Sequence, residues 1–120
     1  MASGRGFLTT HILDTAKGCP AKGVRIDVYR LYGAERKLIK TAISNEGGRT
    51  DEPIIAKGRM EIGTYELVFA IGDYFSGAMN SEAVPFIDIV PIRFGISDAD
   101  EHYHVPLLAS PYSYSTYRGS

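Results

Sequence analysis

Short stretches of alternating hydrophobic and polar residues recur along the chain, and this alternation is typical of half-buried β-strands. Residues 63–71 show it most clearly, because Tyr65, Leu67 and Phe69 would all lie on one face. With the similar stretch at residues 24–31, the pattern and the intervening turn residues predict eight strands. These strands are expected at residues 7–13, 24–31, 38–44, 53–56, 63–71, 85–94, 101–108 and 112–117.

Turn-forming residues separate the expected strands and leave room for one short helix. Residues 17–20 predict a turn after the first strand, and residues 45–48 predict another after the third. Residues 73–81 form the one plausible helical turn, with Asp73 as its capping residue. Pro91 cannot donate a ladder hydrogen bond, so the strand around it is expected either at the edge of a sheet or with a bulge.

The length and composition indicate one globular domain. The chain has 120 residues, of which 44% are hydrophobic and 22% are charged. These values are ordinary for a soluble domain with a substantial core. No repeat or linker divides the sequence, so we expect a single all-β, two-sheet sandwich over residues 1–120, with residues 1–6 as a flexible N-terminal tail.

Charge and cysteine content exclude several classes of protein. The formal net charge is −1 and no basic run is present, which argues against binding to nucleic acid. Cys19 is the one cysteine, so no disulfide can form within the chain. No apolar run is long enough for a signal peptide or a membrane span. We therefore expect a cytoplasmic protein without a nucleic-acid or membrane partner.

Three histidines, His11, His102 and His104, are the main candidates for chemistry. His102 and His104 are two residues apart in an expected strand, so their side chains leave the same face. They could act as general acid and base, or they could be ordinary surface histidines. The three imidazoles could instead hold a zinc ion with one open position. Against zinc, strand alternation points Glu101 away from His102.

Arg49 is a candidate for binding a planar anion. It follows Gly47 and Gly48 at a turn, where its guanidinium could form two parallel hydrogen bonds to a carboxylate or imide-like group. The commoner alternative is an arginine solvated at a turn. The serines at 110, 113 and 115 lack the Gly-x-Ser-x-Gly context of a nucleophile, and Cys19 before a proline is an incidental thiol.

The end of the chain resembles a known family. Residues 102–108 and 110–120 are similar to the C-terminal signature of the 5-hydroxyisourate hydrolases in the transthyretin-like family. The final Tyr-Arg-Gly-Ser, residues 117–120, separates those enzymes from transthyretin. Residues 8–14 resemble the family's N-terminal strand, and residues 41–50 resemble its arginine-bearing turn. The resemblance therefore extends from residue 8 to residue 120.

The resemblance implies a transthyretin-like (prealbumin-like) sandwich of eight strands with one short helix. It also implies a homotetramer, a dimer of dimers, with active sites in a channel between the dimers and with neither metal nor cofactor. By position, the implied catalytic residues are His11, Arg49, His104 and Ser120. The implied substrate-binding residues are His11, Arg49 and Tyr117, and the supporting residues are His102, Arg118 and Gly119.

The implied reaction is the hydrolysis of 5-hydroxyisourate, a step of urate breakdown, by water attack on a ring amide carbonyl. A neutral histidine would accept the proton of water, and Arg49 would stabilise negative charge. Tyr117 is expected to narrow the channel from the strand face that also bears Ser113 and Ser115. Arg118 is expected to hold the chain end by ion pairing. The alternative is a non-catalytic transthyretin-like protein that binds a small molecule.

Overall fold

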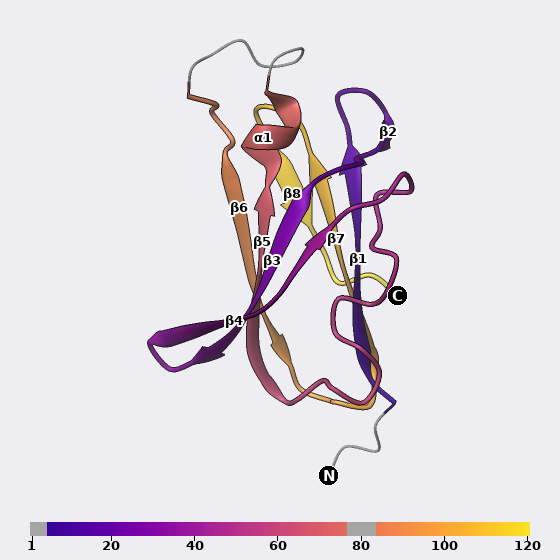
Figure 1. Ribbon diagram of the computed structural model, residues 1–120, viewed down its shortest axis with the longest axis vertical. Coiled ribbons are helices and arrows are strands. Elements are labelled where there is room, and N and C mark those ends of the chain that lie inside the picture. The colour runs from indigo at the N-terminus through magenta and orange to yellow at the C-terminus, as the bar shows by residue number, and fades with distance from the viewer. Residues whose placement is uncertain (1–4, 77–83) are drawn as a thin grey trace.

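Two four-stranded β-sheets pack face to face in the computed structural model, which describes residues 5–76 and 84–120 (Figure 1). The first sheet has the order β2-β1-β7-β8, formed by Cys19–Pro20, Phe7–Asp14, His102–Ala109 and Tyr114–Thr116. The second has the order β4-β3-β5-β6, formed by Glu35–Ile43, Arg25–Tyr32, Gly63–Ala70 and Ile89–Ile96. Helix α1, Ile71–Phe75, follows β5 directly. The predicted all-β sandwich with one short helix is confirmed for these residues.

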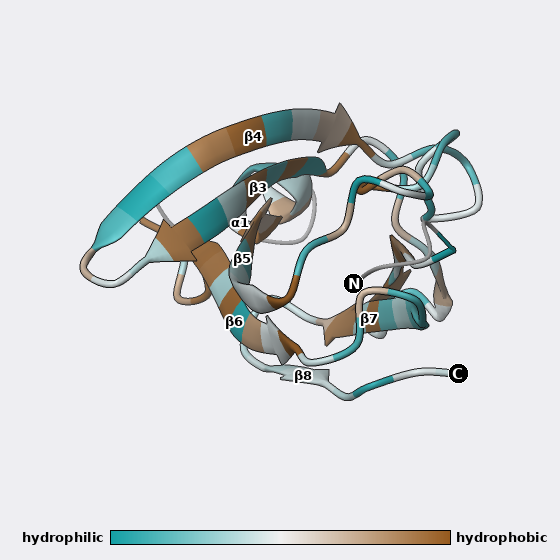
Figure 2. Ribbon diagram, turned by 90° about the horizontal axis from the view of Figure 1, so that it is seen from below, coloured by the Kyte–Doolittle hydropathy of each residue, from teal (hydrophilic) through white to brown (hydrophobic). Residues whose placement is uncertain are grey.

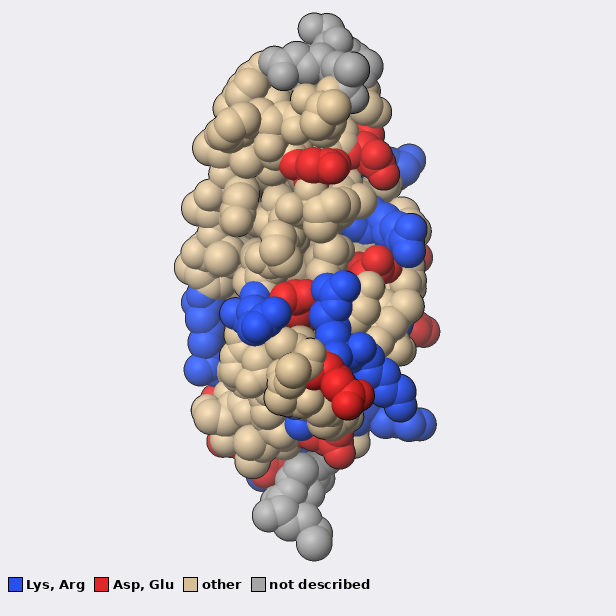
Figure 3. Space-filling model, turned by 90° about the vertical axis from the view of Figure 1, so that its left-hand side faces the viewer, with Lys and Arg blue, Asp and Glu red and all other residues tan. Residues whose placement is uncertain are grey.

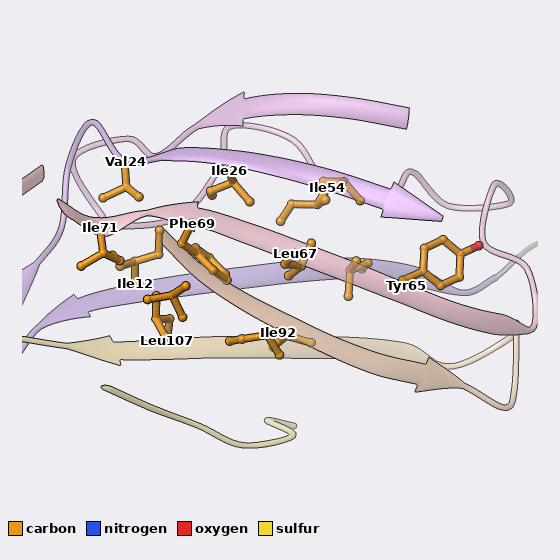
Figure 4. Close-up of a cluster of buried hydrophobic side chains, with 14 of the residues drawn as sticks. Ile12, Val24, Ile26, Ile54, Tyr65, Leu67, Phe69, Ile71, Ile92 and Leu107 are labelled. Carbon is orange, nitrogen blue, oxygen red and sulfur yellow. The ribbon is translucent and has the colours of Figure 1, made fainter. Parts of the chain in front are cut away.

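The core lies between the two sheets and follows from the alternation of the sequence. Along β3, hydrophobic and hydrophilic residues alternate (Figure 2). Leu67 and Phe69 of β5 point from one sheet toward Ile12 and Leu107 of the other, and all four are fully buried (Figure 4). Burial of such a side chain contributes about 1.5–3 kcal/mol, so this interface is the main support of both sheets.

Strands β1 and β7 pair in parallel, whereas the other named strand pairs of the described residues are antiparallel. The register places Phe7 opposite His102 and Thr9 opposite His104. Residues that face each other across a ladder share one side of the sheet. Thr9, His102 and His104 therefore lie together on the outer face, while the alternate residues of both strands point into the core.

The segment between β4 and β5 runs beside β1 on the open side of the sandwich (Figure 1). Leu8 and Ile55 exchange two backbone hydrogen bonds, and the amide of Ile12 donates to the carbonyl of Gly48 at 2.8 Å. Gly48 has a φ of 73°, and a Cβ there would collide with the carbonyl oxygen of Ile12. A glycine is therefore required at position 48 for this segment to reach β1.

Two strand predictions were wrong. Residues 53–56 form no strand, because this segment meets β1 only at the isolated bridge between Leu8 and Ile55. Conversely, Cys19 and Pro20, predicted as part of a turn, form the short strand β2, which pairs with Leu13 and Asp14. In both cases the neighbouring strand, rather than local sequence, decides whether a short segment joins a ladder.

The helix differs from its prediction in position and capping. α1 begins at Ile71, and Ala70 precedes it without a side-chain cap. Asp73 lies inside the helix rather than at its start, so its predicted capping role was wrong. The remainder of the predicted helical turn, from residue 77 on, lies outside the described residues. Among the described residues, no helix combines the length and apolar character needed to cross a membrane.

Other expectations concern the edges of the fold. β6 forms one edge of its sheet, so the edge position predicted from Pro91 is confirmed. Most of the expected tail, residues 1–4, lies outside the described residues. Gly6, the last residue of that expected tail, is buried, and its carbonyl accepts a hydrogen bond from the amide of Gly58 at 3.2 Å.

A buried carboxylate connects the end of β1 to the helix. Asp14 is fully buried, and its Oδ1 accepts hydrogen bonds from the amides of Ala16 and Lys17. Its Oδ2 accepts from the hydroxyl of Tyr74 at 2.8 Å. Burial, together with this hydrogen bond, raises the pKa of Tyr74 well above its ordinary value. Tyr74 therefore stays protonated and keeps α1 attached to the first sheet.

Candidate active site

A cavity of about 330 Å3 opens between β1, β7, the segment after β4 and the end of the chain. Small-molecule sites commonly have volumes of 300–1,000 Å3, so its size suits one small ligand. Four segments far apart in the sequence contribute to its wall. The lining residues are Thr9, Thr10, Arg49, Thr50, Asp51, Glu52, Pro53, His102, His104 and Ser120.

Thr9 holds two of the three histidines in fixed positions. Its Oγ1 lies 2.6 Å from Nε2 of His102 and 2.8 Å from Nδ1 of His104, so both contacts are hydrogen bonds. The ring of Phe7 stacks on His102, with centroids 4.1 Å apart and planes inclined by 7°. His104 is half-buried and lines the cavity, whereas His102 is exposed at its rim.

His11 and His104 are kept neutral by their surroundings. Burial lowers the pKa of His104 below its ordinary value of 6.5, and the charges of Arg49, His102 and His11 lower it further. Burial and Arg49 also lower the pKa of His11, against the opposing effect of a hydrogen bond to the backbone of Gly47. A neutral imidazole at neutral pH can accept a proton from water.

Arg49 is positioned by a turn organised around Asn45. The Oδ1 of Asn45 accepts hydrogen bonds from the amides of Gly47 and Arg49, at 2.9 and 3.2 Å. The Nδ2 of the same side chain donates to Oδ1 of Asp51 at 2.9 Å. The Arg49 side chain is exposed and lines the cavity opposite β7. The predicted turn therefore places a guanidinium where it can contact an anionic or carbonyl group of a ligand.

The end of the chain lies directly on His104. The amide of Gly119 donates a hydrogen bond to the carbonyl of His104 at 2.8 Å. A Cβ on Gly119 would collide with Cδ2 of the His104 ring, so only glycine fits at this position. The next residue, Ser120, lines the cavity. The chain end therefore lies against the Cδ2 edge of the imidazole and contributes Ser120 to the cavity wall.

Arg118 holds this terminal segment in place. Its Nη2 lies 2.9 Å from Oε2 of Glu101, and its guanidinium stacks 4.1 Å from the centre of the Tyr103 ring. The ion pairing expected for Arg118 is therefore confirmed. Glu101 directly precedes β7 and Tyr103 belongs to it, so the strand that bears His104 also fixes the terminus.

Within a single chain, the side chain of Tyr117 does not line this cavity. Its side chain is 61% exposed and lines a second hollow, together with Phe94, Val105 and Arg118. Strand β8 ends at Thr116, whose Oγ1 donates to the carbonyl of Pro106. The structure therefore brings together His102, His104, Arg49 and Ser120, with His11 beside them, and leaves Tyr117 apart.

The zinc arrangement considered for the three histidines has no counterpart among the described residues, where no group of three His, Cys, Asp or Glu is placed to hold a metal ion. The Thr9 hydroxyl engages Nε2 of His102 and Nδ1 of His104. Glu101, the nearby carboxylate in sequence, pairs with Arg118. One nitrogen of each of these two histidines is thus engaged by the same hydroxyl.

Six lining residues were missed as site candidates, among them Thr9, Asp51 and Glu52. Strand alternation was a signal for Thr9, because it places this residue on the face of His11. The contact of Thr9 with His104 depends on the parallel pairing of β1 with β7, which no local pattern reveals. Asp51 and Glu52 are common turn residues, and nothing in the sequence distinguishes them as part of a site.

Comparison with known proteins assigns the chain to a family. The model of the HIUase/Transthyretin family matches residues 8–119. The chain belongs to this family. Among its relatives, 5-hydroxyisourate hydrolase 2 of Rhizobium meliloti is 59% identical over 116 residues, which cover 96% of this chain and 97% of the relative. The likeness to this relative therefore extends over nearly the whole of both chains.

Solved structures of the HIUase/Transthyretin fold agree with the architecture. The crystal structure of an (S)-allantoin synthase matches 99% of this chain with a TM-score of 0.90 and 45% identity, and this chain spans 45% of its length. Sea bream transthyretin in complex with thyroxine matches 93% of each chain with a TM-score of 0.82 and 27% identity. The fold alone therefore does not separate an enzyme from a binding protein.

The low pKa of His104 can be tested directly. We expect its imidazole to titrate below 6.5, and we expect Arg49→Ala to raise its pKa, because a nearby positive charge is removed. Measurement of the histidine ring resonances by NMR against pH gives both values. Arg25→Ala, at an exposed ion pair on the other sheet, is the control and should leave the titration unchanged. If the pKa of His104 in Arg49→Ala is equal to or lower than in the wild type, the proposed effect of the Arg49 charge on His104 is wrong.

Proposed function

We propose that this chain is an enzyme that hydrolyses 5-hydroxyisourate to 2-oxo-4-hydroxy-4-carboxy-5-ureidoimidazoline in urate breakdown. The observation that carries the proposal is the position of Gly119 and Ser120 against His104, beside Arg49, in a cavity of about 330 Å3. The high identity to the Rhizobium meliloti hydrolase over nearly the whole chain supports the same activity.

In the proposed reaction, His104 and His11 activate water and transfer protons. Both imidazoles have a pKa below the ordinary value, so each is neutral at pH 7 and can accept a proton. Water loses a proton to one of them, and its oxygen bonds to a ring carbonyl carbon. The carbon–nitrogen bond then breaks, the ring nitrogen takes a proton, and the carbonyl carbon becomes that of a carboxylate.

Arg49 and Ser120 have different roles in this proposal. The guanidinium of Arg49 faces the cavity and stabilises the negative charge that develops on the attacked carbonyl oxygen. Ser120 positions the ring or the attacking water from the opposite side, and Arg118 and Gly119 keep Ser120 there. His102 supports His104 through Thr9.

Substitution of the two central residues tests the assignment. We expect His104→Ala and Arg49→Ala each to lower kcat/KM for 5-hydroxyisourate by about 100-fold or more, since general bases and oxyanion partners contribute on this scale. The measurement is the ultraviolet decay of 5-hydroxyisourate generated from urate. Arg25→Ala on the other sheet provides the matched arginine control and should retain the wild-type rate.

If 5-hydroxyisourate decays only at the uncatalysed rate in the presence of the wild-type protein, the proposal that this chain is an enzyme is wrong. If the wild type nevertheless binds the compound tightly, the transthyretin-like binding protein becomes the better description. If wild type is active and both alanine variants match it, the activity resides elsewhere and the site assignment is wrong.

The chain end offers a second test. We expect a short Gly-Ser extension after Ser120 to lower kcat/KM about tenfold or more, because the terminal residue lines the cavity and additional residues would fill it. The same extension placed before Met1 is the control. Equal activity of the two extended proteins would remove Ser120 from the site.

We also propose that the chain forms a homotetramer. The surface over the upper part of β6 carries almost no charged side chains (Figure 3). Large apolar residues are exposed at the two sheet edges, including Ile89 of β6 and Tyr114 of β8, and the rings of Phe86 and Tyr112 lie 6.2 Å apart. Exposed apolar patches at free strand edges are typical of subunit interfaces. In such an assembly Tyr117 would face a neighbouring subunit and narrow the channel.

Light scattering during size-exclusion chromatography measures the assembly. We expect four times the chain mass of 13.1 kDa, and we expect Ile89→Lys to lower the mass by placing a charge in an apolar contact. Arg25→Ala, outside this surface, serves again as the control. A monomeric wild type at micromolar concentration would contradict the proposed tetramer.

A further inference from the structure

Thr9 makes two short hydrogen bonds with one hydroxyl group. Its Oγ1 contacts Nε2 of His102 at 2.6 Å and Nδ1 of His104 at 2.8 Å. A hydroxyl has one proton to donate, so it can donate to only one of two unprotonated ring nitrogens. When both histidines are neutral, Thr9 must donate to one imidazole and accept from the other, and the two tautomers are therefore coupled.

Two coupled states are possible. In the first, Nδ1–H of His104 donates to Thr9, and Thr9 donates to Nε2 of His102, which leaves Nε2 of His104 unprotonated. In the second, Nε2–H of His102 donates to Thr9, and Thr9 donates to Nδ1 of His104. The ring proton of His104 is then on Nε2. The first state makes His104 a general base, and the second makes it a general acid.

The ring of His104 is held at two places, and neither contact engages Nε2. Nδ1 is engaged by Thr9, and Cδ2, the neighbour of Nε2 in the ring, lies against Gly119. Nε2 is therefore the ring nitrogen that Thr9 leaves free, and His104 lines the cavity together with Ser120. The hydroxyl of Thr9 and the chain end contact opposite sides of the ring and define its orientation.

We propose that Thr9 and His102 complete a proton relay with His104, in which Thr9 sets the tautomer of His104 and His102 is the terminal proton acceptor. This inference rests on the proposed hydrolase function and adds two residues to it. Thr9 is a positioning residue, because it acts through His104. The relay continues from the half-buried His104 to the exposed His102, and so it connects the cavity with solvent.

The proton transfers balance at each step. Water gives a proton to Nε2 of His104, and its oxygen bonds to the carbonyl carbon. Nδ1 of His104 gives its proton to Thr9, which gives its own to Nε2 of His102. The result is an oxyanion on the substrate and a cationic His102. When the carbon–nitrogen bond breaks, the same transfers run in reverse, and Nε2 of His104 protonates the leaving nitrogen.

The surroundings of His102 suit this terminal role. Phe7 stacks on the ring at 4.1 Å and keeps Nε2 directed toward Thr9. Charge on His102 forms 6.1 Å from the His104 ring centre, so it is separated from the reacting atoms by one residue. The charged groups around the cavity are Arg49, Asp51 and Glu52, with His11 beside them. The two carboxylates can offset the positive charge that the relay creates.

A pair of substitutions at Thr9 tests the relay. Thr9→Val keeps the shape and removes the hydroxyl, and we expect it to lower kcat about 10- to 100-fold with little change in KM. Thr9→Ser restores the hydroxyl and should recover most of the lost rate. Thr41→Val, which removes a hydroxyl from β4 of the other sheet, is the neutral control.

A second readout does not depend on activity. Nitrogen-15 NMR of the histidine rings at pH 7.5 distinguishes the two tautomers. In the wild type we expect Nδ1 of His104 to be protonated and Nε2 to be free, and in Thr9→Val we expect the proton at Nε2. Rates in mixtures of H2O and D2O should show more than one moving proton in the wild type and one in Thr9→Val.

His102→Asn completes the experiment through a double-substitution cycle. If His102 acts through Thr9, the variant with both Thr9→Val and His102→Asn should be about as slow as Thr9→Val alone. Full additivity of the two losses would overturn the relay. A wild-type His104 protonated at Nε2, or a Thr9→Val variant with unchanged tautomer and rate, would also overturn it. An inactive wild type with the expected tautomer would refute the hydrolase while leaving the hydrogen-bonded arrangement intact.

Discussion

The parallel pairing of β1 with β7 is the constraint on which the candidate site depends. This one register places Thr9 opposite His104 and Phe7 opposite His102. A shift by one residue would turn the whole set of side chains to the other face of the sheet. The core residues on the inner face, such as Ile12 and Leu107, fix the register because both are fully buried. Packing inside the sandwich thereby determines chemistry on its outer surface.

The polar part of the site combines two effects that keep an imidazole neutral. Burial and the charge of Arg49 both disfavour protonation of His104. The same guanidinium is available to a ligand in the cavity. One residue therefore adjusts the basicity of the histidine and interacts with the substrate of the proposed reaction, and the Asn45 turn that holds it serves both purposes.

The sequence predicted the parts of the fold that local alternation determines. β3 and β5 appeared close to their predicted bounds, because buried apolar residues alternate with other residues along much of each strand. β2 and the segment at residues 53–56 were predicted incorrectly, because a neighbouring strand decides their pairing. For the site, residue type and family resemblance identified His104, Arg49 and Ser120. The Thr9 contact could not be predicted, because it depends on a register between distant segments.

The distance between those segments along the chain has a consequence for folding. Thr9 and His104 are 95 residues apart, and β1 leaves the ribosome long before β7 is synthesised. Until then the edge of β1 that pairs with β7 has no partner strand. Closure of the large loop between the two strands is slow. Gly119, which lies against the His104 ring, is separated from Thr9 by a still longer stretch of chain. The cavity therefore cannot assemble from local structure, and it forms only when segments from both halves of the sequence have come together.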